Sequence, residues 1–274
     1  MLITAALILI VTSKFVLGHD FRRPVKEEII PLDMAPDSVD DRYDGCRKEM
    51  KNLVSEKYLN KETCSDISEF GEAYIYSTGD IPGPHKLKMH HLIAIYVYTG
   101  HVLFERFNHD VRTGRQKYKD KTYKWYSQHF LLTEAIQILK KTQKGCKLTY
   151  SGTKLTVNEN VLNREIRFGS FVSTSRTSNV AMKFGSESCF EIKTCEGADV
   201  SKFSPLPNEK EVLIPPYETF KVTDIKKRGQ KGAWCKTVFV LKSTGIKSNL
   251  NCAVASVETK KYHNVTNLKY LNYL

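Results

Sequence analysis

Two glutamates, Glu209 and Glu211, stand one residue apart beside a short apolar run that ends at Pro215 and Pro216. The run 212–214 predicts a strand, because its β-branched residues favour strands and a double proline ends a strand ladder. Alternate residues of a strand point to one face, so both carboxylates are expected to converge on one ligand. Such a pair suits a reaction that develops positive charge and needs a base, as cleavage of a glycosidic bond does. A solvated edge strand with ordinary surface charges is the plainer interpretation.

The elements that precede this pair are expected to be mainly helical. Apolar residues recur at roughly helical spacing over 43–58, and the range 86–98 has an apolar helical face. The last part of that range, 95–98, is also compatible with a strand. The clearest amphipathic helix is 130–139, which lysines and Gly145 end.

After Cys146 the pattern changes to short strands separated by turns. Helices first and strands second indicate an α+β fold rather than an alternating parallel-sheet fold. We expect one compact domain from about 25 to about 258. The strand-like segments are 148–150, 154–157, 166–173, 188–194, 211–214, 220–225 and 237–242.

Both ends of the chain bear on localisation. The apolar block 2–11 is too short to span a membrane comfortably, and it predicts a signal peptide over 1–18, with a signal anchor as the alternative. The polar tail 259–274 carries no hydrophobic anchor signal. Asn264 begins the single glycosylation sequon. A secreted protein without a membrane anchor is the prediction.

Cysteine and charge content narrow the function classes. All seven cysteines lie beyond the predicted signal and fit disulfides with one left over. Their spacing matches no zinc pattern, so no metal is expected. The net charge of +12 is concentrated around 112–124 and 226–236. Such a surface attracts anions, but no nucleic-acid motif is present, and a generally basic surface is the simpler interpretation.

Five strings in register resemble one family, the vertebrate ecto-type arginine-specific mono-ADP-ribosyltransferases. The resemblance covers about residues 32 to 253. It implies an ADP-ribosyltransferase-like fold, in which the mainly helical N-terminal part packs on a C-terminal β-sandwich of short strands. The strings are LDMAPDSVDDRYDGC (32–46), YTG (98–100), HFLLTEA (129–135), FGSFVSTS (168–175) and EKEVLIPPY (209–217).

The resemblance implies NAD as substrate and assigns catalytic roles to three residues. Glu211 would accept from the ribose 2′-hydroxyl and stabilise the oxocarbenium-like centre left when nicotinamide departs. Glu209 would hold and help deprotonate the acceptor guanidinium. Ser173 would orient Glu211 by a hydrogen bond. Repulsion between the two glutamates is expected to raise the pKa of one of them.

One position departs from the family pattern. Where the family has Tyr-Arg-Gly-Thr, this chain has YSGT over 150–153, so Ser151 replaces the arginine that neutralises the pyrophosphate. A charged hydrogen bond of this kind contributes about 1.5–3 kcal/mol. Lys154, Arg164 or Arg167 could supply charge from nearby. The alternatives are therefore a slow enzyme, one with a substitute cation, or an inactive relative that acts as a binding or decoy protein.

Other residues are implied in cofactor binding. Gly152 would let the backbone approach the nicotinamide closely, and Phe184 would stack on it, although a core phenylalanine fits as well. Tyr98 is a weaker candidate, and Ser151 and Ser173 complete the set. NADP is left open as a second substrate, and NAD glycohydrolysis as a second reaction.

The resemblance also implies disulfides and partners. The pairs would be Cys46–Cys252 and Cys146–Cys195, with one further pair and a free thiol possible among the remaining three. The acceptors would be arginine-bearing extracellular or luminal proteins, with no nucleic acid involved, and the chain would act as a monomer. The cysteines without an implied partner are Cys64, Cys189 and Cys235.

Overall fold

The computed structural model describes residues 29–63, 87–100 and 103–255. Four predictions fall on other parts of the chain. The features concerned, which lie outside the described residues, are the signal peptide 1–18, the partner of Cys64, the tail 259–274 and the glycosylation of Asn264.

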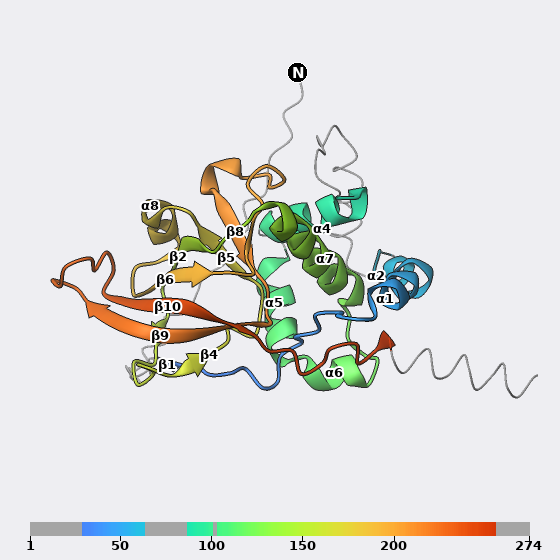
Figure 1. Cartoon of the computed structure of the whole chain (residues 1–274), viewed down its shortest axis with the longest axis horizontal. Coiled ribbons are helices and arrows are strands. Elements are labelled where there is room, and N and C mark those ends of the chain that lie inside the picture. The colour runs from blue at the N-terminus through green and yellow to red at the C-terminus, as the bar shows by residue number, and fades with distance from the viewer. Residues whose placement is uncertain (1–28, 64–86, 101–102, 256–274) are drawn as a thin grey trace, which may run out of the picture.

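The helices that come before Cys146 precede the main sheet along the chain and gather on one side of it (Figure 1), as the α+β prediction requires. Residues 95–98 are helical, so the strand alternative for this stretch was wrong. The helices before Cys146 are α1 (Arg47–Leu53), the π-helical turn η1 (Val54–Tyr58), α2 (Leu59–Thr63), α4 (Met89–Thr99), α5 (Phe104–Thr113), α6 (Arg115–Lys119) and α7 (Tyr126–Thr142).

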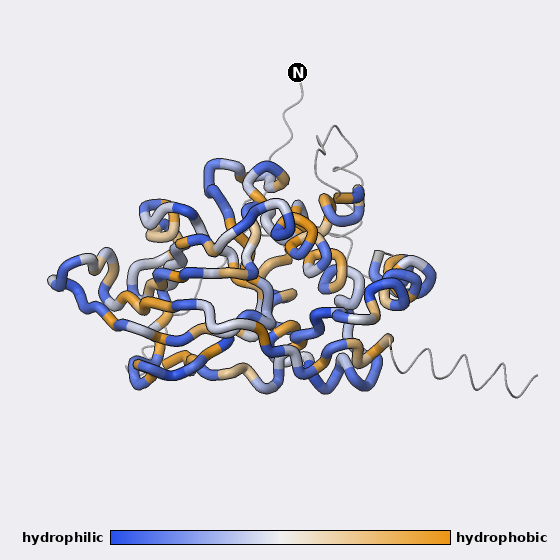
Figure 2. The backbone as a smooth tube through the Cα atoms, in the orientation of Figure 1, coloured by the Kyte–Doolittle hydropathy of each residue, from blue (hydrophilic) through white to orange (hydrophobic). Residues whose placement is uncertain are grey.

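Helix α7 forms the centre of the helical layer. Leu132, Ile136 and Leu139 follow at helical spacing, and each is fully buried. These side chains join a large apolar cluster with residues of α4 and with Ala198 and Leu213 of two later strands. Figure 2 shows hydrophobic colour in α4 and α7 and in separate patches along the strands. Burial of this helix therefore fixes the helical layer against the sheet.

Eight strands form one mixed, mostly antiparallel sheet in the order β4-β9-β10-β6-β2-β5-β8-β7, with β10 and β6 parallel. A separate two-stranded ladder pairs β1 with β3. The strands are β1 (Ile29–Ile30), β2 (Lys147–Thr153), β3 (Thr156–Val157), β4 (Glu165–Ile166), β5 (Val172–Ser175), β6 (Ser188–Thr194), β7 (Ala198–Asp199), β8 (Glu211–Ile214), β9 (Glu218–Lys227) and β10 (Thr237–Ile246).

The sheet divides where β2 meets β5, because these strands share a single residue pair, Tyr150 with Ser175. The predicted sandwich is thus two parts of one hydrogen-bonded sheet. The larger part runs from β4 to β2 and the smaller contains β5, β8 and β7. The segment that holds the glutamate pair belongs to the smaller part.

The single strand predicted over 166–173 was wrong, since β4 and β5 are separate strands of different parts of the sheet. Gly169 between them has φ +71°, a left-handed conformation that breaks a strand and favours glycine. A Cβ at this glycine would lie 2.3 Å from the Cβ of Ala35. Close approach of the N-terminal segment therefore requires both the turn and the missing side chain.

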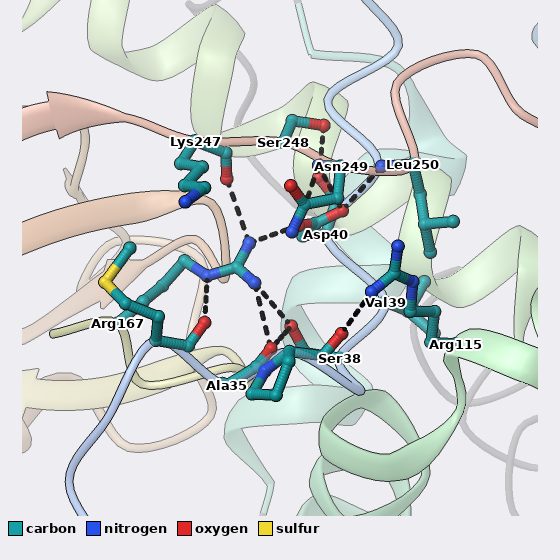
Figure 3. A network of polar contacts seen from close by, with 12 residues as sticks. Ala35, Ser38, Val39, Asp40, Arg115, Arg167, Lys247, Ser248, Asn249 and Leu250 are labelled. Atoms are coloured by element: carbon teal, nitrogen blue, oxygen red, sulfur yellow. Dashed lines mark hydrogen bonds and ion pairs between the residues drawn. The ribbon is translucent and has the colours of Figure 1, made fainter.

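A buried polar network ties the two ends of the described chain together (Figure 3). Asp40 and Arg167 form an ion pair with no exposure on either side chain. Asp40 also accepts from the backbone N–H groups of Asn249 and Leu250, at 2.9 Å each. The Arg167 guanidinium donates in addition to the carbonyl oxygen of Lys247 at 2.9 Å. The acidic string at 32–46 thus serves the fold, because it holds the segment that follows β10.

Candidate active site

Glu211 is the first residue of β8 and lies opposite Ser175 of β5. Its side chain is 1 % exposed. The Ser173 hydroxyl, two residues along β5 on the same face, donates a hydrogen bond to Oε1 of Glu211. Two adjacent antiparallel strands therefore bring the serine and the last glutamate of the sequence motifs into direct contact.

The second carboxyl oxygen of Glu211 has a different environment. Oε2 is buried, and no hydrogen-bond partner reaches it from the residues that the structure describes. Burial raises the pKa of Glu211 to about 8, the Ser173 hydrogen bond opposes this shift, and the charge of Glu209 adds to it. The predicted rise in pKa is present, but its principal cause is burial rather than repulsion. An unsatisfied buried acceptor is an open place for a hydroxyl donor of a ligand.

The structure corrects the predicted position of Glu209. This residue ends the 3-10 turn η3 (Pro207–Glu209) rather than standing in a strand beside Glu211. Lys210 between the two glutamates has φ +49°, in the left-handed region. The alternation of a strand therefore does not relate the two carboxylates. They remain near neighbours in the chain, and the charge of Glu209 adds to the raised pKa of Glu211.

Ser175 helps to fix this turn, a role that sequence reasoning missed. Its hydroxyl donates to the carbonyl oxygen of Glu209 at 2.7 Å. Ser173 and Ser175 alternate on one strand face, so one serine reaches Glu211 and the other holds the backbone of Glu209. The available signal was the Ser-Thr-Ser spacing itself, in which both serines share a face.

Ser151 lies beside this pair on β2. Its hydroxyl is 3.5 Å from the carbonyl oxygen of Ser173, at the limit of a hydrogen bond. The position that carries arginine in the family pattern thus adjoins the site but holds a short neutral side chain. Arg167 does not substitute for the lost charge, because it is wholly buried against Asp40. That candidate was wrong, whereas Arg164 and Lys154 are exposed.

Gly152, the next residue of β2, has a packing reason to be glycine. A Cβ there would lie 2.4 Å from the carbonyl oxygen of Gly185 and 2.6 Å from that of Ala181. Helix α8 (Ser178–Ala181) and the 3-10 turn η2 (Met182–Phe184) therefore sit directly on this strand. The atoms that approach Gly152 closely therefore belong to the protein's own segment of α8 and η2, not to a ligand.

The two aromatic candidates differ in exposure. Phe184, at the end of η2, is 45 % exposed. Tyr98 of α4 is 1 % exposed, and its hydroxyl accepts from Asn108 at 3.1 Å. Burial raises the pKa of Tyr98, and the charge of Glu211 raises it further. The ring of Tyr98 packs edge-on against Phe104, Phe107 and Phe171, so Tyr98 is a core residue.

Three disulfides join the described cysteines. Cys46–Cys252 and Cys146–Cys195 are the pairs that the resemblance implies. The third disulfide joins Cys189 and Cys235, two of the three cysteines for which the resemblance implied no partner. Cys189 lies opposite Gly152 in the sheet, so this bond stabilises the β6 neighbour of the site. Disulfides in this number indicate an oxidising compartment.

The described residues provide neither a cluster of metal ligands nor a helix that could span a membrane. Over 29–63, 87–100 and 103–255, no three His, Cys, Asp or Glu side chains gather closely enough to hold a metal ion. Within the same ranges, no helix combines the length and apolar character that crossing a membrane requires.

Comparison with known proteins identifies relatives. The profile of the family described as NAD:arginine ADP-ribosyltransferase matches residues 32–243. NAD(P)(+)--arginine ADP-ribosyltransferase 2 of Gallus gallus is 34% identical over 209 residues, which are 70% of this chain and 64% of that protein. Ecto-ADP-ribosyltransferase 4 of Homo sapiens is 34% identical over 247 residues, 85% of this chain and 76% of that protein.

Solved structures agree with the sequence relatives. The crystal structure of the eucaryotic mono-ADP-ribosyltransferase ART2.2 superposes with a TM-score of 0.69 at 29% identity, covering 81% of this chain and 98% of that one. A variant of ART2.2 in complex with NAD gives a TM-score of 0.68 at 28% identity, with the same coverage.

Proposed function

The chain belongs to the NAD:arginine ADP-ribosyltransferase family, and we propose that it transfers ADP-ribose from NAD to arginine side chains of proteins, releasing nicotinamide. The observation that carries the proposal is the Glu211 carboxyl. One of its oxygens is held by Ser173, and the other is buried without a partner among the described residues. The ribose 2′-hydroxyl of NAD supplies the missing donor.

The chemistry follows from where charge develops. The bond between ribose C1′ and the nicotinamide nitrogen breaks, and nicotinamide leaves with the electron pair. The positive charge that develops on the ribose favours the ionised form of Glu211, which burial otherwise disfavours. This carboxylate thus interacts more strongly with the transition state than with free NAD, as catalysis requires.

We assign Glu209 the role of activating the acceptor arginine. A guanidinium nitrogen attacks C1′, and the proton that it loses passes to this carboxylate. The turn η3 presents Glu209 separately from Glu211, since Glu209 is half-buried whereas Glu211 is enclosed. Separation of the two environments fits separate roles in NAD cleavage and acceptor activation.

A direct experiment uses labelled NAD and agmatine, a small guanidine acceptor. Purified protein is expected to form ADP-ribosylagmatine and release nicotinamide in equal amounts. Glu209→Ala should retain nicotinamide release to water but lose the agmatine adduct. Absence of adduct and of nicotinamide release at high enzyme concentration would remove the proposal. Equal loss of both reactions in Glu209→Ala would remove the role given to that residue.

Ser151 favours a second candidate, a family member with impaired chemistry that acts by binding. No arginine occupies this position beside Ser173. Ser151→Arg separates the two functions. A gain of roughly 10 to 150-fold in kcat/KM for NAD identifies a slowed enzyme, as expected for one restored charged hydrogen bond. No turnover in either form, with NAD bound in calorimetry, identifies a binding protein.

We also propose that the protein is exported and acts as a monomer on extracellular or luminal proteins. The three disulfides support export, because such bonds persist in oxidising compartments. Fractionation of expressing cells into medium, membrane and cytosol tests this, and retention in the cytosol would contradict it.

A further inference from the structure

An open pocket of about 450 Å³ lies where the C-terminal end of α7 meets β7 and the start of β2. The end of α7 holds the edge strand here, because the Gln143 side chain donates to the carbonyl oxygen of Asp199 at 2.9 Å and accepts from its N–H at 2.8 Å. The pocket therefore has a fixed wall. Its lining residues are Thr142, Gln143, Lys147, Asp199, Lys202 and Phe203.

Cations surround this pocket. Lys147 and Lys202 line it, and Arg176 approaches its Asp199 with Nη1 at 3.5 Å from Oδ2. The backbone N–H of Arg176 donates to the carbonyl oxygen of Lys210 at 3.1 Å, so Lys210 adjoins the same group. We call Lys147, Arg176, Lys202 and Lys210 the basic rim. Asp199 is the single acid that lines the pocket.

The rim carries more positive charge than its own acids neutralise. Across the described ranges, no carboxylate forms an ion pair with Lys147, Lys202 or Lys210, whereas Arg176 has Asp199. Burial lowers the pKa of Lys147, the charges of Lys140 and Arg176 lower it further, and the charge of Asp199 opposes this shift. Lys147 and Arg176 therefore repel one another, and an anion placed beside them relieves the repulsion.

The rim is continuous with the glutamate pair. Asp199 pairs with Val212 of β8, and the N–H of Val200 donates to the carbonyl oxygen of Glu211 at 3.0 Å. The loop that carries Lys202 thus begins beside Glu211 and ends at η3, which presents Glu209. Lys202 and Lys210 of the rim therefore stand on either side of this turn in the chain.

We propose that the basic rim selects acceptor arginines that have aspartate or glutamate a few residues away. This inference rests on the proposed function, and it specifies the class of acceptor for the same site. An extended chain spans about 3.3 Å per residue, so carboxylates two to four residues from the arginine lie roughly 7–13 Å from it. Acidic peptides in this range meet Lys147, Arg176, Lys202 or Lys210.

The test compares two peptides of equal length with one central arginine, one flanked by glutamates and one by glutamines. Wild-type protein should show about tenfold higher kcat/KM for the acidic peptide, because two or more partly exposed charge pairs contribute. The preference should fall as salt rises, since exposed charges are screened. In the double variant Lys147→Gln/Lys202→Gln, the two peptides should approach equal kcat/KM.

A matched control removes two lysines elsewhere. Lys117 and Lys124 line a separate basic pocket beside α5 and α6. Lys117→Gln/Lys124→Gln lowers the net charge by the same amount and should keep the peptide preference. An equal loss in this control would reduce the effect to overall charge and overturn the role of the rim.

Agmatine and direct binding separate the two proposals. Agmatine has no flanking residues, so its turnover reports on the proposed function alone. If agmatine is modified and wild type treats both peptides equally, the rim proposal fails while the function stands. Fluorescence anisotropy of the labelled peptides tests the rim without turnover, and equal binding of both peptides overturns it. An increase in KM for NAD in the rim variant, with the peptide preference unchanged, would assign the rim to NAD phosphates instead.

Discussion

Two buried carboxyl groups, Asp40 and Glu211, occupy opposite extremes of hydrogen bonding in this protein. Asp40 has no exposure and receives the Arg167 guanidinium and the N–H groups of Asn249 and Leu250 (Figure 3). Glu211 is 1 % exposed and has a donor on one oxygen, with the other left open among the described residues.

The difference shows how one chemical group serves the fold at one place and the reaction at another. Folding fills the acceptor sites of Asp40, so its buried charge is compensated by hydrogen bonds and by the ion pair. Folding leaves Glu211 incomplete, and burial raises the pKa of Glu211 to about 8. A ligand must therefore supply the hydrogen-bond donor that Oε2 of Glu211 lacks among the described residues.

Glu211→Gln should give the largest effect. It removes the charge while keeping the shape, and turnover should fall by at least about 10²–10³-fold, as for loss of a principal electrostatic group. Stability should not fall with it. The folded-state pKa of Glu211 lies above the unfolded value. The contribution of Glu211 to the stability of the wild type is therefore lost as pH rises through the window from about 4.5 to about 8. The variant lacks this loss.

Kinetics and thermal melts from pH 5 to 9 check both halves of this expectation. Another buried carboxyl, Glu62, also has its pKa raised by burial to about 8. Glu62 is present in both the wild type and the Glu211→Gln variant. The difference in Tm between wild type and variant therefore reports on Glu211. A variant less stable than wild type at pH 9 would show that the fold uses this carboxylate after all.

Arg167→Met should show the opposite behaviour. The change leaves the buried Asp40 charge without its ion-pair partner, which typically costs about 3–5 kcal/mol of the free energy of unfolding. Activity per folded molecule should stay close to wild type, because Arg167 lies in the network that ties the chain ends. Urea unfolding and turnover at 15 °C measure the two quantities.

Arg164→Met is the matched control for this variant. Arg164 is three residues away and exposed, so its loss should change stability little. A large loss of turnover in folded Arg167→Met would instead return Arg167 to the candidates for a substitute cation, and the contrast between the two carboxyl sites would weaken.

Ser173→Ala should have an intermediate effect. It removes the hydrogen bond to Oε1 of Glu211, and a hydrogen bond to a charged group contributes about 1.5–3 kcal/mol, or roughly 10 to 150-fold in kcat/KM. This bond lowers the pKa of Glu211, so the variant should need a higher pH for half-maximal kcat/KM. A loss of activity with an unchanged pH profile would exclude a role through Glu211. Ser173→Thr, which keeps the hydroxyl, should restore part of the activity.

The order of helices and strands, and part of the candidate site, could be predicted from the sequence alone. The helical spacing of α7 and the β-branched runs of β6 and β8 are local patterns, and the structure follows them. The position of Glu209 was not predictable from alternation, because Lys210 takes a left-handed conformation that side-chain type does not reveal. Local pattern therefore located the glutamates but not their geometry.

Contacts between distant segments were also beyond sequence reasoning. Arg167 was considered as a cation for the site because it lies near Ser151 in the chain. Its partner is instead Asp40, 127 residues away. The Cys189–Cys235 pair has the same character, since two neighbouring parallel strands, β6 and β10, bring these residues together. Only tertiary packing decides such partners.

The pH dependence of wild-type kcat/KM should give the smallest effect and the finest comparison. If ionised Glu211 is required and the pKa of Glu211 is about 8 in the free enzyme, kcat/KM should rise about tenfold between pH 7 and 9 and then level. Turnover of agmatine at six pH values, with NAD well below KM, measures this profile. The acceptor guanidinium stays charged throughout, so its own ionisation does not shape the curve.

Glu209→Ala provides the control for this profile, read as nicotinamide release to water. Removing the neighbouring charge should lower the pKa of Glu211, because that charge contributes to its rise. The profile should therefore move to lower pH while keeping its form. A flat wild-type profile from pH 6 to 9 would mean that Glu211 is ionised as readily as a fully hydrogen-bonded carboxylate. The open oxygen would then have a partner in solution, and the reason for assigning NAD to it would be lost.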